Sequence, residues 1–305
     1  MATYLRPKTL LEALTILAHA AVSHAALSAP SGPVDRLTIV AGATDFFPVV
    51  TTRQAWCQPA PENILDISGI KELFGVTSSR IGAMVTWTDV INAPLPFAFD
   101  ALKQASRQVG GVQIQNRGTL AGNLCNASPA ADGVPPLLAL DAVVEIARFD
   151  LQTKRIERRS VALDHFILGN RKTALAPDEM VVAVHIAHHS AAERSYFSKL
   201  GARSYLVISI ASVAANIAVD SNGVITTARI AVGACSATPQ RLTALEQRLV
   251  GVKKTTAIGV VTKEMLSSLA PIDDVRATAA YRLQAAHILV QRVLAQLTAP
   301  MEQAA

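Results

Sequence analysis

The sequence predicts an α+β protein of two domains, and three features support this. Thr9 followed by Glu12 has the spacing of a capping box, which opens an amphipathic helix near the N-terminus. Residues 141–147 and 155–160 are strand-type runs joined by a polar turn, so they predict an antiparallel pair. Residues 275–297 return to the period of a helix, with apolar side chains at Leu283, Ala286, Val290, Leu294 and Leu297.

The composition is that of a compact globular chain. Its 305 residues, 50% hydrophobic and 17% charged, are enough for two or three modules with a sizeable core. The formal net charge of +5 does not indicate a nucleic-acid partner, because the basic residues are scattered and no aromatic–basic stripe accompanies them. We therefore expect no nucleic acid among the partners.

Neither the cysteines nor the histidines predict a metal or cluster site. Cys57, Cys125 and Cys235 are isolated in the sequence, whereas an iron–sulfur cluster normally takes four cysteines. His188 and His189 would point to opposite faces of a strand, and no carboxylate is spaced to join them as a ligand. We expect unpaired thiols and no metal held by this chain.

Neither a leader nor a membrane segment is predicted. Residues 1–6 do not open a basic start followed by an apolar run and a cleavage site, as a signal peptide would. The most apolar run, residues 205–219, is interrupted by Ser209, Ser212 and Asn216 and falls short of the roughly 20 residues that a spanning helix needs. It is typical of a buried strand, and we expect a cytoplasmic protein.

Between these features, short strands alternate with helices. In chain order, the predicted elements are strands at 37–40, 63–67 and 80–85, helices from Thr88 and over 99–109, strands at 207–219 and 224–232, and a helix opened by residues 233–241 and running through Leu249.

A turn of small residues follows the first predicted strand. Residues 41–45, Ala-Gly-Ala-Thr-Asp, lead into a helix that begins at Phe46. A helix N-terminus offers amide donors and a favourable dipole to a pyrophosphate group. The turn lacks the Gly-x-Gly-x-x-Gly spacing of a dinucleotide fold, so an ordinary strand–turn–helix connection is the alternative interpretation.

The most distinctive stretch is residues 110–132, Gly-Gly-Val-Gln-Ile-Gln-Asn-Arg-Gly-Thr-Leu-Ala-Gly-Asn-Leu-Cys-Asn-Ala-Ser-Pro-Ala-Ala-Asp, which runs into Pro-Leu-Leu-Ala-Leu as the lead of a strand. Gly118 and Gly122 have no Cβ, so the backbone can approach a ligand closely. Side chains such as Thr119, Asn123 and Ser128 can hydrogen-bond phosphate or ribose oxygens. The stretch fits a loop around an anion, and a cluster of tight turns between two strands fits it as well.

The order Gln-Asn-Arg-Gly-Thr-Leu-Ala-Gly-Asn-Leu, then Ala-Ser-Pro and Asp132, resembles the second FAD-binding loop of the medium subunit of molybdenum hydroxylases. This is the family of bacterial xanthine dehydrogenases and aerobic carbon monoxide dehydrogenases. The similarity extends nearly end to end, from Tyr-Leu-Arg-Pro near the N-terminus to Tyr281-Arg282 in the last predicted helix. The family commonly has Arg where Gln115 stands and often Gly where Ala121 stands, and neither departure removes the phosphate cradle.

The resemblance implies FAD contacts in four parts of the chain and no catalytic acid or base. Without it, residues 109–111 would be a plain helix C-cap, and Val181 and Lys199 would be ordinary strand residues. By resemblance, Val181 packs against the flavin ring and Lys199 is a cation close to it, suited to the charge of the reduced ring. The implied contacts are Ala41, Gly42, Ala43, Thr44, Asp45 and Phe46, then Val109, Gly110 and Gly111, then Gly118, Thr119, Ala121, Gly122, Asn123, Asn126, Ser128 and Asp132, and finally Val181 and Lys199.

The fold that the resemblance implies is α+β, with a two-lobed FAD-binding domain of the vanillyl-alcohol oxidase (PCMH) type at residues 1–185. The lobes would cover about 1–58 and 59–185, and a C-terminal domain of antiparallel sheet plus helices would cover 190–305. The chain would be the FAD subunit of a heterotrimeric molybdenum hydroxylase, expected as a dimer of heterotrimers. A large molybdopterin subunit would oxidise the substrate, a small [2Fe–2S] subunit would pass the electrons on, and FAD here would deliver them to NAD⁺, oxygen or another acceptor.

Two alternatives stay open. One is a self-contained flavin oxidoreductase of the same fold, in which a substrate meets the flavin directly. The other is a non-catalytic nucleotide-binding scaffold subunit. The absence of a paired acid–base constellation argues against the first.

Overall fold

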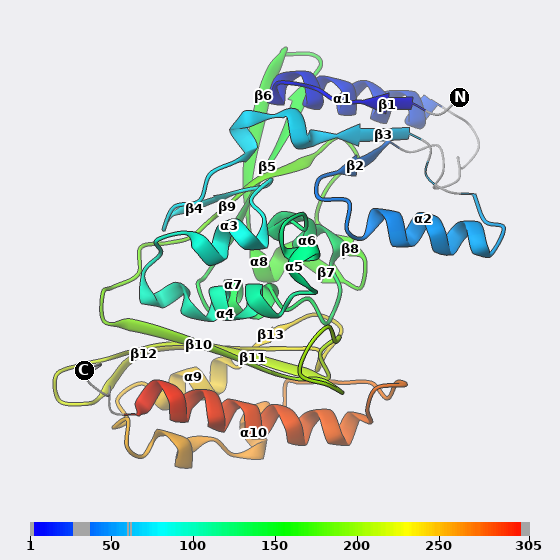
Figure 1. The fold of residues 1–305 in the computed structure, drawn as a ribbon. Coiled ribbons are helices and arrows are strands. Elements are labelled where there is room, and N and C mark those ends of the chain that lie inside the picture. The colour runs from blue at the N-terminus through cyan, green and yellow to red at the C-terminus, as the bar shows by residue number, and fades with distance from the viewer. Residues whose placement is uncertain (1–2, 27–36, 60, 62, 300–305) are drawn as a thin grey trace.

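The structure is a computed structural model that describes residues 3–26, 37–59, 61 and 63–299, and three main sheets alternate in it with helices (Figure 1). The first sheet is small and parallel, in the order β1-β3-β2, with β1 at Thr3–Leu5, β2 at Thr38–Val40 and β3 at Asn63–Asp66. Parallel neighbours need crossover connections. The helices α1 (Leu10–Ala26) and α2 (Phe46–Ala55) lie in those connections.

The predicted N-terminal helix is confirmed as α1. Thr9 Oγ1 accepts a hydrogen bond from the Glu12 amide at 3.2 Å, so the predicted cap opens the helix. The helix buries one stripe with helical spacing, at Leu10, Ala13, Leu14, Leu17 and Ala18. The helix α2 differs, because it buries none of its side chains.

The second sheet is antiparallel, in the order β4-β9-β5-β6. Its strands are β4 (Arg80–Gly82), β5 (Val143–Asp150), β6 (Arg155–Ala162) and β9 (Met180–His185). The predicted pair is confirmed, with a register that runs from Val143 opposite Ala162 to Asp150 opposite Arg155. The helix α8 (Leu163–Phe166) and a short hairpin of β7 (Ile167–Gly169) and β8 (Lys172–Thr173) follow β6.

A layer of short helices lies between the second and third sheets (Figure 1). It contains α3 (Trp87–Asn92), α4 (Asp100–Gln108), α5 (Val112–Gln115), α6 (Leu120–Asn126) and α7 (Val134–Leu138). The expected strand lead after Asp132 was therefore wrong. Pro135 and Pro136 lie in the first turn of α7, where proline loses no helical hydrogen bond.

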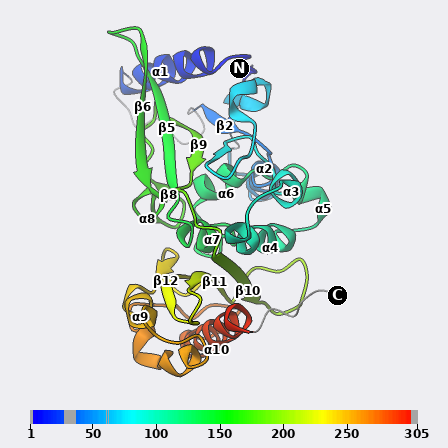
Figure 2. The same ribbon diagram turned by 90° about the vertical axis from the view of Figure 1, so that its left-hand side faces the viewer.

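The third sheet is antiparallel, in the order β10-β11-β12-β13. Its strands are β10 (Glu193–Leu200), β11 (Ala211–Val219), β12 (Ile225–Gly233) and β13 (Gln240–Arg241), and Figure 2 shows α9 (Thr243–Leu249) and α10 (Ala279–Thr298) on its far side. The strand expected from Val207 begins only at Ala211. Before it, Arg203 donates to the carbonyls of Tyr205 and Leu206 and holds residues 201–210 as a loop. The helix expected from residue 233 begins only at Thr243, after β13.

The two faces of the third sheet have different partners. Side chains such as Val213 and Ile217 enter a hydrophobic core shared with α9 and α10. On the opposite face, Phe197 and Ala214 pack against alanines of α4 and against Ala139, which follows α7. A separate, larger core joins the first two sheets and the helix layer. No helix within the described part of the chain is long and apolar enough to cross a membrane.

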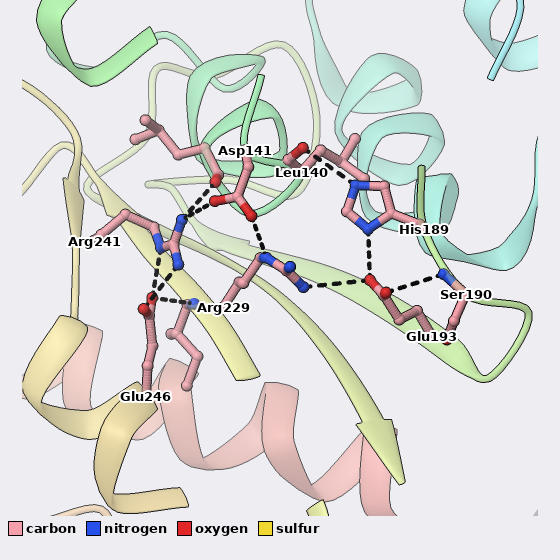
Figure 3. Close-up of polar contacts among 10 residues, drawn as sticks. Leu140, Asp141, His189, Ser190, Glu193, Arg229, Arg241 and Glu246 are labelled. Atoms are coloured by element: carbon pink, nitrogen blue, oxygen red, sulfur yellow. Dashed lines mark hydrogen bonds and ion pairs between the residues drawn. The ribbon is translucent and has the colours of Figure 1, made fainter. Parts of the chain in front are cut away.

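A network of charged side chains joins the end of α7 to the third sheet (Figure 3). Asp141 accepts from Arg229 and, at 2.6 Å, from Arg241. Arg229 also lies 3.4 Å from a Glu193 carboxylate oxygen, and His189 Nδ1 lies 2.5 Å from the same oxygen. The His189 ring is therefore a partner of Glu193 at the junction of the two parts of the chain. The sequence had suggested no carboxylate partner for it.

We expect Ser195→Ala to weaken this junction. The buried Ser195 hydroxyl accepts from the Ala101 amide at 2.9 Å and donates to Phe97 O at 3.2 Å. The variant leaves the buried Ala101 amide without this partner, whereas Phe97 O keeps its hydrogen bond from the Asp100 amide. The expected cost is about 1–2 kcal/mol, seen as a fall of a few degrees in Tm. Ser198→Ala, on the opposite face of the same strand, is the control. Equal Tm values for the two variants would contradict the role given to Ser195.

Candidate functional site

A cavity of about 1140 Å³ lies between the first lobe, the helix α6 and the strand β9. A volume of this size exceeds the pockets that hold drug-sized ligands. The sequence-predicted residues that line it are Ala41, Gly42, Ala43, Thr44, Asp45, Phe46, Val109, Gly118, Thr119, Ala121, Gly122, Asn123, Asn126 and Val181. The structure thus brings the two predicted loops to one site.

The two loops cross with their backbones in contact. A Cβ built on Gly42 would lie 1.8 Å from the Arg117 carbonyl oxygen, a distance that no side chain can tolerate. A Cβ on Gly118 would lie 3.0 Å from the Ile114 carbonyl oxygen and 3.3 Å from Thr44 Oγ1. Close approach of the backbones requires glycine at Gly42 and leaves little room for a Cβ at Gly118, and the crossing joins the two lobes at the cavity.

The first loop presents free backbone donors. Among the described residues, the amides of Ala43, Thr44, Asp45 and Phe46 donate to no acceptor, although the Ala43 and Asp45 carbonyls accept from α2. Ala43 has a φ of 63°, the left-handed region that alanine rarely adopts. This conformation changes the direction of the chain directly before α2. The unpaired amides at the start of that ten-residue helix form an electropositive surface suited to phosphate.

The second loop is in large part the helix α6. Thr119 is its N-cap, and Thr119 Oγ1 accepts from the Gly122 amide at 3.0 Å. Gly122 lies inside this helix and is not among the residues with positive φ. Its lack of a Cβ matters for another reason, because a Cβ there would lie 2.7 Å from Thr119 Oγ1 and would disturb the cap.

Asn123, on the same helix, has a buried side-chain oxygen with no hydrogen-bond partner among the described residues. A buried acceptor without a donor costs free energy, and Asn123 lines the cavity. The oxygen packs against Gly133, where a Cβ would lie 2.9 Å from it, so a ligand hydroxyl could supply the missing donor only after the amide group turned toward the cavity. The free amides of residues 43–46 and the polar side chains of Thr119 and Asn123 line one cavity, and together they fit the pyrophosphate and polyol parts of FAD.

The segment before β9 forms another wall and was not predicted in full. Leu175, Ala176, Pro177, Glu179 and Met180 line the cavity beside Val181. Glu179 is buried and accepts two hydrogen bonds from Arg159, at 2.6 and 2.7 Å, and one from the Ala176 amide at 2.8 Å. The hydrogen bonds from Arg159 hold the pKa of Glu179 below its usual range. Nothing in the local sequence indicates this pair, because its members lie on separate segments.

Five predicted contacts do not line the cavity: Gly110, Gly111, Ser128, Asp132 and Lys199. Gly110 has a φ of 57°, and Gly111 lies against Tyr205 and Leu206 of the loop before β11. Lys199 Nζ lies 2.6 Å from Asp132 Oδ2, so these two residues form a buried ion pair. Burial raises the pKa of Asp132, although Lys199 opposes the shift. The contact of these five residues with FAD stays a prediction.

The cavity offers no pair of groups for acid–base chemistry among the residues described. Glu179 is held by Arg159. Cys125 also lines the cavity, and desolvation raises the pKa of its thiol to about 12, so the thiol is neutral. Asp45 is exposed at the start of α2. The site can bind and orient a group, but it shows no side chains arranged to transfer a proton.

The fold and the cavity define a two-lobed dinucleotide-binding protein with a separate α+β unit behind the site. Comparison with known proteins agrees. The FAD binding domain in molybdopterin dehydrogenase matches residues 1–188, and the CO dehydrogenase flavoprotein C-terminal domain matches residues 196–297. The chain belongs to the family of FAD-binding subunits of molybdopterin dehydrogenases, and it is a subunit of an oxidoreductase. The family, the cofactor FAD and the α+β fold expected from the sequence are confirmed.

The similar proteins cover most of the chain. The nicotinate dehydrogenase FAD-subunit of Eubacterium barkeri is 35% identical over 225 residues, which are 71% of this chain and 73% of that protein. The xanthine dehydrogenase FAD-binding subunit of Escherichia coli O157:H7 is 29% identical over 245 residues, covering 78% and 82%. A structure of carbon monoxide dehydrogenase from Hydrogenophaga pseudoflava matches 98% of each chain with a TM-score of 0.79 and 26% identity.

We expect Gly42→Ala to reduce FAD affinity at least roughly tenfold, or about 1.4 kcal/mol. The added methyl group would overlap the Arg117 carbonyl oxygen, so the two loops would have to separate. Fluorescence titration of the apoprotein with FAD measures the effect. Gly259→Ala is the control, because no atom lies within 4 Å of a Cβ at Gly259. Wild-type affinity in Gly42→Ala would show that the crossing of the loops does not shape the site.

We expect Glu179→Gln to destabilise the chain by about 1–2 kcal/mol at pH 7, a value discounted because the Arg159 side chain is 42% exposed. The folded-state pKa of Glu179 is lowered. The stabilisation is therefore fully present above the unfolded-state pKa of about 4.3 and is lost as the pH falls through the lower folded value. Urea unfolding between pH 3 and pH 7 tests this.

Wild type and Glu179→Gln should approach the same free energy of unfolding near the acid end of this pH range. Glu157→Gln is the matched control, because the Arg148–Glu157 pair is about half exposed at both ends and should contribute little. A difference between wild type and Glu179→Gln that does not change with pH would rule out the ion pair as its source.

Proposed function

We propose that this chain is the electron-transfer subunit of a molybdenum hydroxylase complex, in which its FAD accepts electrons from a partner and delivers them to NAD⁺, oxygen or another acceptor. The partners would be a small subunit with [2Fe–2S] clusters and a large molybdopterin subunit, assembled as a dimer of heterotrimers in the cytoplasm. FAD supplies reversible electron transfer when it is bound. Support comes from the names of the similar proteins, which include FAD subunits and a medium chain of dehydrogenases.

The single observation that favours electron transfer over direct substrate chemistry is the character of the cavity. Its walls provide free amides at residues 43–46, which suit the pyrophosphate of a dinucleotide. Among the described residues they provide no acid paired with a base: Glu179 is held by Arg159, the Cys125 thiol is neutral, and Asp45 is a lone exposed carboxylate. A self-contained oxidoreductase would normally need an acid–base pair near the ring.

The proposed binding residues divide into three roles. Residues 41–46 would hold the pyrophosphate through backbone amides, and Thr119 and Asn123 would orient hydroxyl groups. Val181 and Val109 would contact apolar parts of the cofactor. We also propose the division into an FAD-binding domain at 1–185, with lobes of about 1–58 and 59–185, and a C-terminal domain at 190–305. The separate cores of the two parts support this division.

The purified chain is expected to show a flavin spectrum that acid precipitation releases completely into the supernatant. Among the described residues no histidine lines the cavity, and the Cys125 thiol is neutral, so it is a weak nucleophile. It should contain no stoichiometric iron. Its flavin should be bleached by the substrate of the complex only when the other subunits are present. Bleaching by substrate in the isolated chain would favour the self-contained enzyme, and a chain that binds no flavin would favour the scaffold.

A further inference from the structure

The segment between β9 and β10 connects the second sheet to the third, and His189 lies on it. The His189 side chain is only 3% exposed. Its two ring nitrogens have different partners (Figure 3): Nδ1 lies 2.5 Å from Glu193 Oε2, on β10, and Nε2 lies 3.2 Å from Leu140 O, just after α7. The ring therefore bridges the third sheet and the helix layer at the point where the chain passes between them.

Both partners of the ring are acceptors. Leu140 O is a carbonyl oxygen. Glu193 is held as a carboxylate, because Arg229 Nη1 lies 3.4 Å from Oε2 and the Ser190 amide donates to Oε1 at 3.1 Å. A neutral imidazole donates from one nitrogen only, whereas an imidazolium donates from both. The two contacts of His189 together therefore require a second proton, and a proton placed on Oε2 instead would leave the pair with the same number.

The surrounding charges also favour a second proton on the ring. The network in Figure 3 contains three carboxylates and two guanidinium groups, those of Asp141, Glu193, Glu246, Arg229 and Arg241. With a neutral ring this network carries one excess negative charge, and a protonated ring balances it. Glu193 is only 7% exposed, so water screens little of the imbalance at the ring.

Other charged side chains on the elements around the ring have partners of their own. Arg194 lies 4.3 Å from the centroid of the Phe97 ring and donates to the Ala191 carbonyl. Asp100, on α4, interacts with basic side chains of its own helix and with Arg194. Phe99, which packs edge-on against the His189 ring, has no charge. The protonation of the ring therefore depends on the network in Figure 3.

We propose that the proton held between His189 and Glu193 fastens the third sheet to the helix layer, and that the junction loosens when rising pH removes this proton. The proton passes to water, and the ring then turns a lone pair toward one of its two acceptors. Because the folded chain binds the proton through two contacts that the unfolded chain lacks, the stabilisation is present at low pH and is lost as the pH rises. This switch needs no bound cofactor, so it is independent of the proposed function.

Selective ¹⁵N labelling of the histidines in the full chain tests the protonation of the ring. At about pH 6, NMR should show a proton on each ring nitrogen of His189, whose signals are recognised by their nuclear Overhauser contacts with the Phe99 ring. By about pH 9, one of the two protons should be lost. A single ring proton at the lower pH, or two that persist at the higher pH, would overturn the proposal.

Two variants of the network should move this titration in opposite directions. Arg229→Gln removes a cation beside Glu193, so the ring should keep its second proton to a higher pH than in wild type. Glu193→Gln removes the anion that the ring faces, so the second proton should be lost at a lower pH. Shifts in the same direction, or no shift in either variant, would contradict the coupling of the ring to the network.

Amide hydrogen exchange measures whether the proton holds the junction together. Two amides donate across the junction and serve as reporters. The Ala101 amide donates to Ser195 Oγ at 2.9 Å, and the Phe197 amide donates to Gln104 Oε1 at 2.7 Å. Their protection from exchange reports how often the helix layer and the third sheet separate.

In His189→Gln, both reporter amides should exchange at least about threefold faster than in wild type at about pH 6, and this difference should disappear by about pH 9. His188→Gln is the matched control, because the neighbouring His188 is exposed, and it should exchange as wild type does at both pH values. Equal exchange in wild type and His189→Gln at the lower pH, or a difference that does not change with pH, would overturn the proposal. If His189→Gln does not fold, the ring titration of the wild-type chain still decides.

Discussion

The contact between the backbones of Gly42 and Arg117 is the constraint on which the site depends. Because a Cβ at Gly42 would lie 1.8 Å from the Arg117 carbonyl oxygen, the first and second loops can meet only through glycine. Their meeting brings residues 43–46 and Asn123 to one cavity. Trp87, whose amide donates to Gly118 O at 3.2 Å, supports the crossing from the helix layer.

Elements with strong local signals could be predicted, because short-range pattern decides them. The cap of α1 and the β5–β6 pair are examples. The loop before β11 could not be predicted, since its apolar residues look like those of a strand, although Tyr205 and Ile208 are each 53% exposed. The same holds for the site. Its loops could be predicted from sequence motifs. The pairing of Lys199 with Asp132 could not, because it depends on how distant segments pack.

The junction between the two parts of the chain combines tight packing with charge. Small side chains such as Ala105 and Ala214 let α4 approach the third sheet closely. Ion pairs around Asp141 and Glu193 then fix the register of that contact (Figure 3). Asp141 is 43% exposed, so its ion pairs contribute more to the choice of geometry than to net stability. The Lys199–Asp132 pair differs from them, because both of its side chains are shielded from solvent.

The helix α2 has a consequence for the local stability of the site. It buries none of its side chains, and it stands out from the first lobe (Figure 1), yet its residues Phe46 and Val49 line the cavity. A helix without buried contacts opens at a lower free energy than the core that it adjoins. Amide hydrogens of α2 should therefore exchange with solvent through local opening, without separation of the lobes. A cofactor bound at the start of α2 should slow this exchange by mass action.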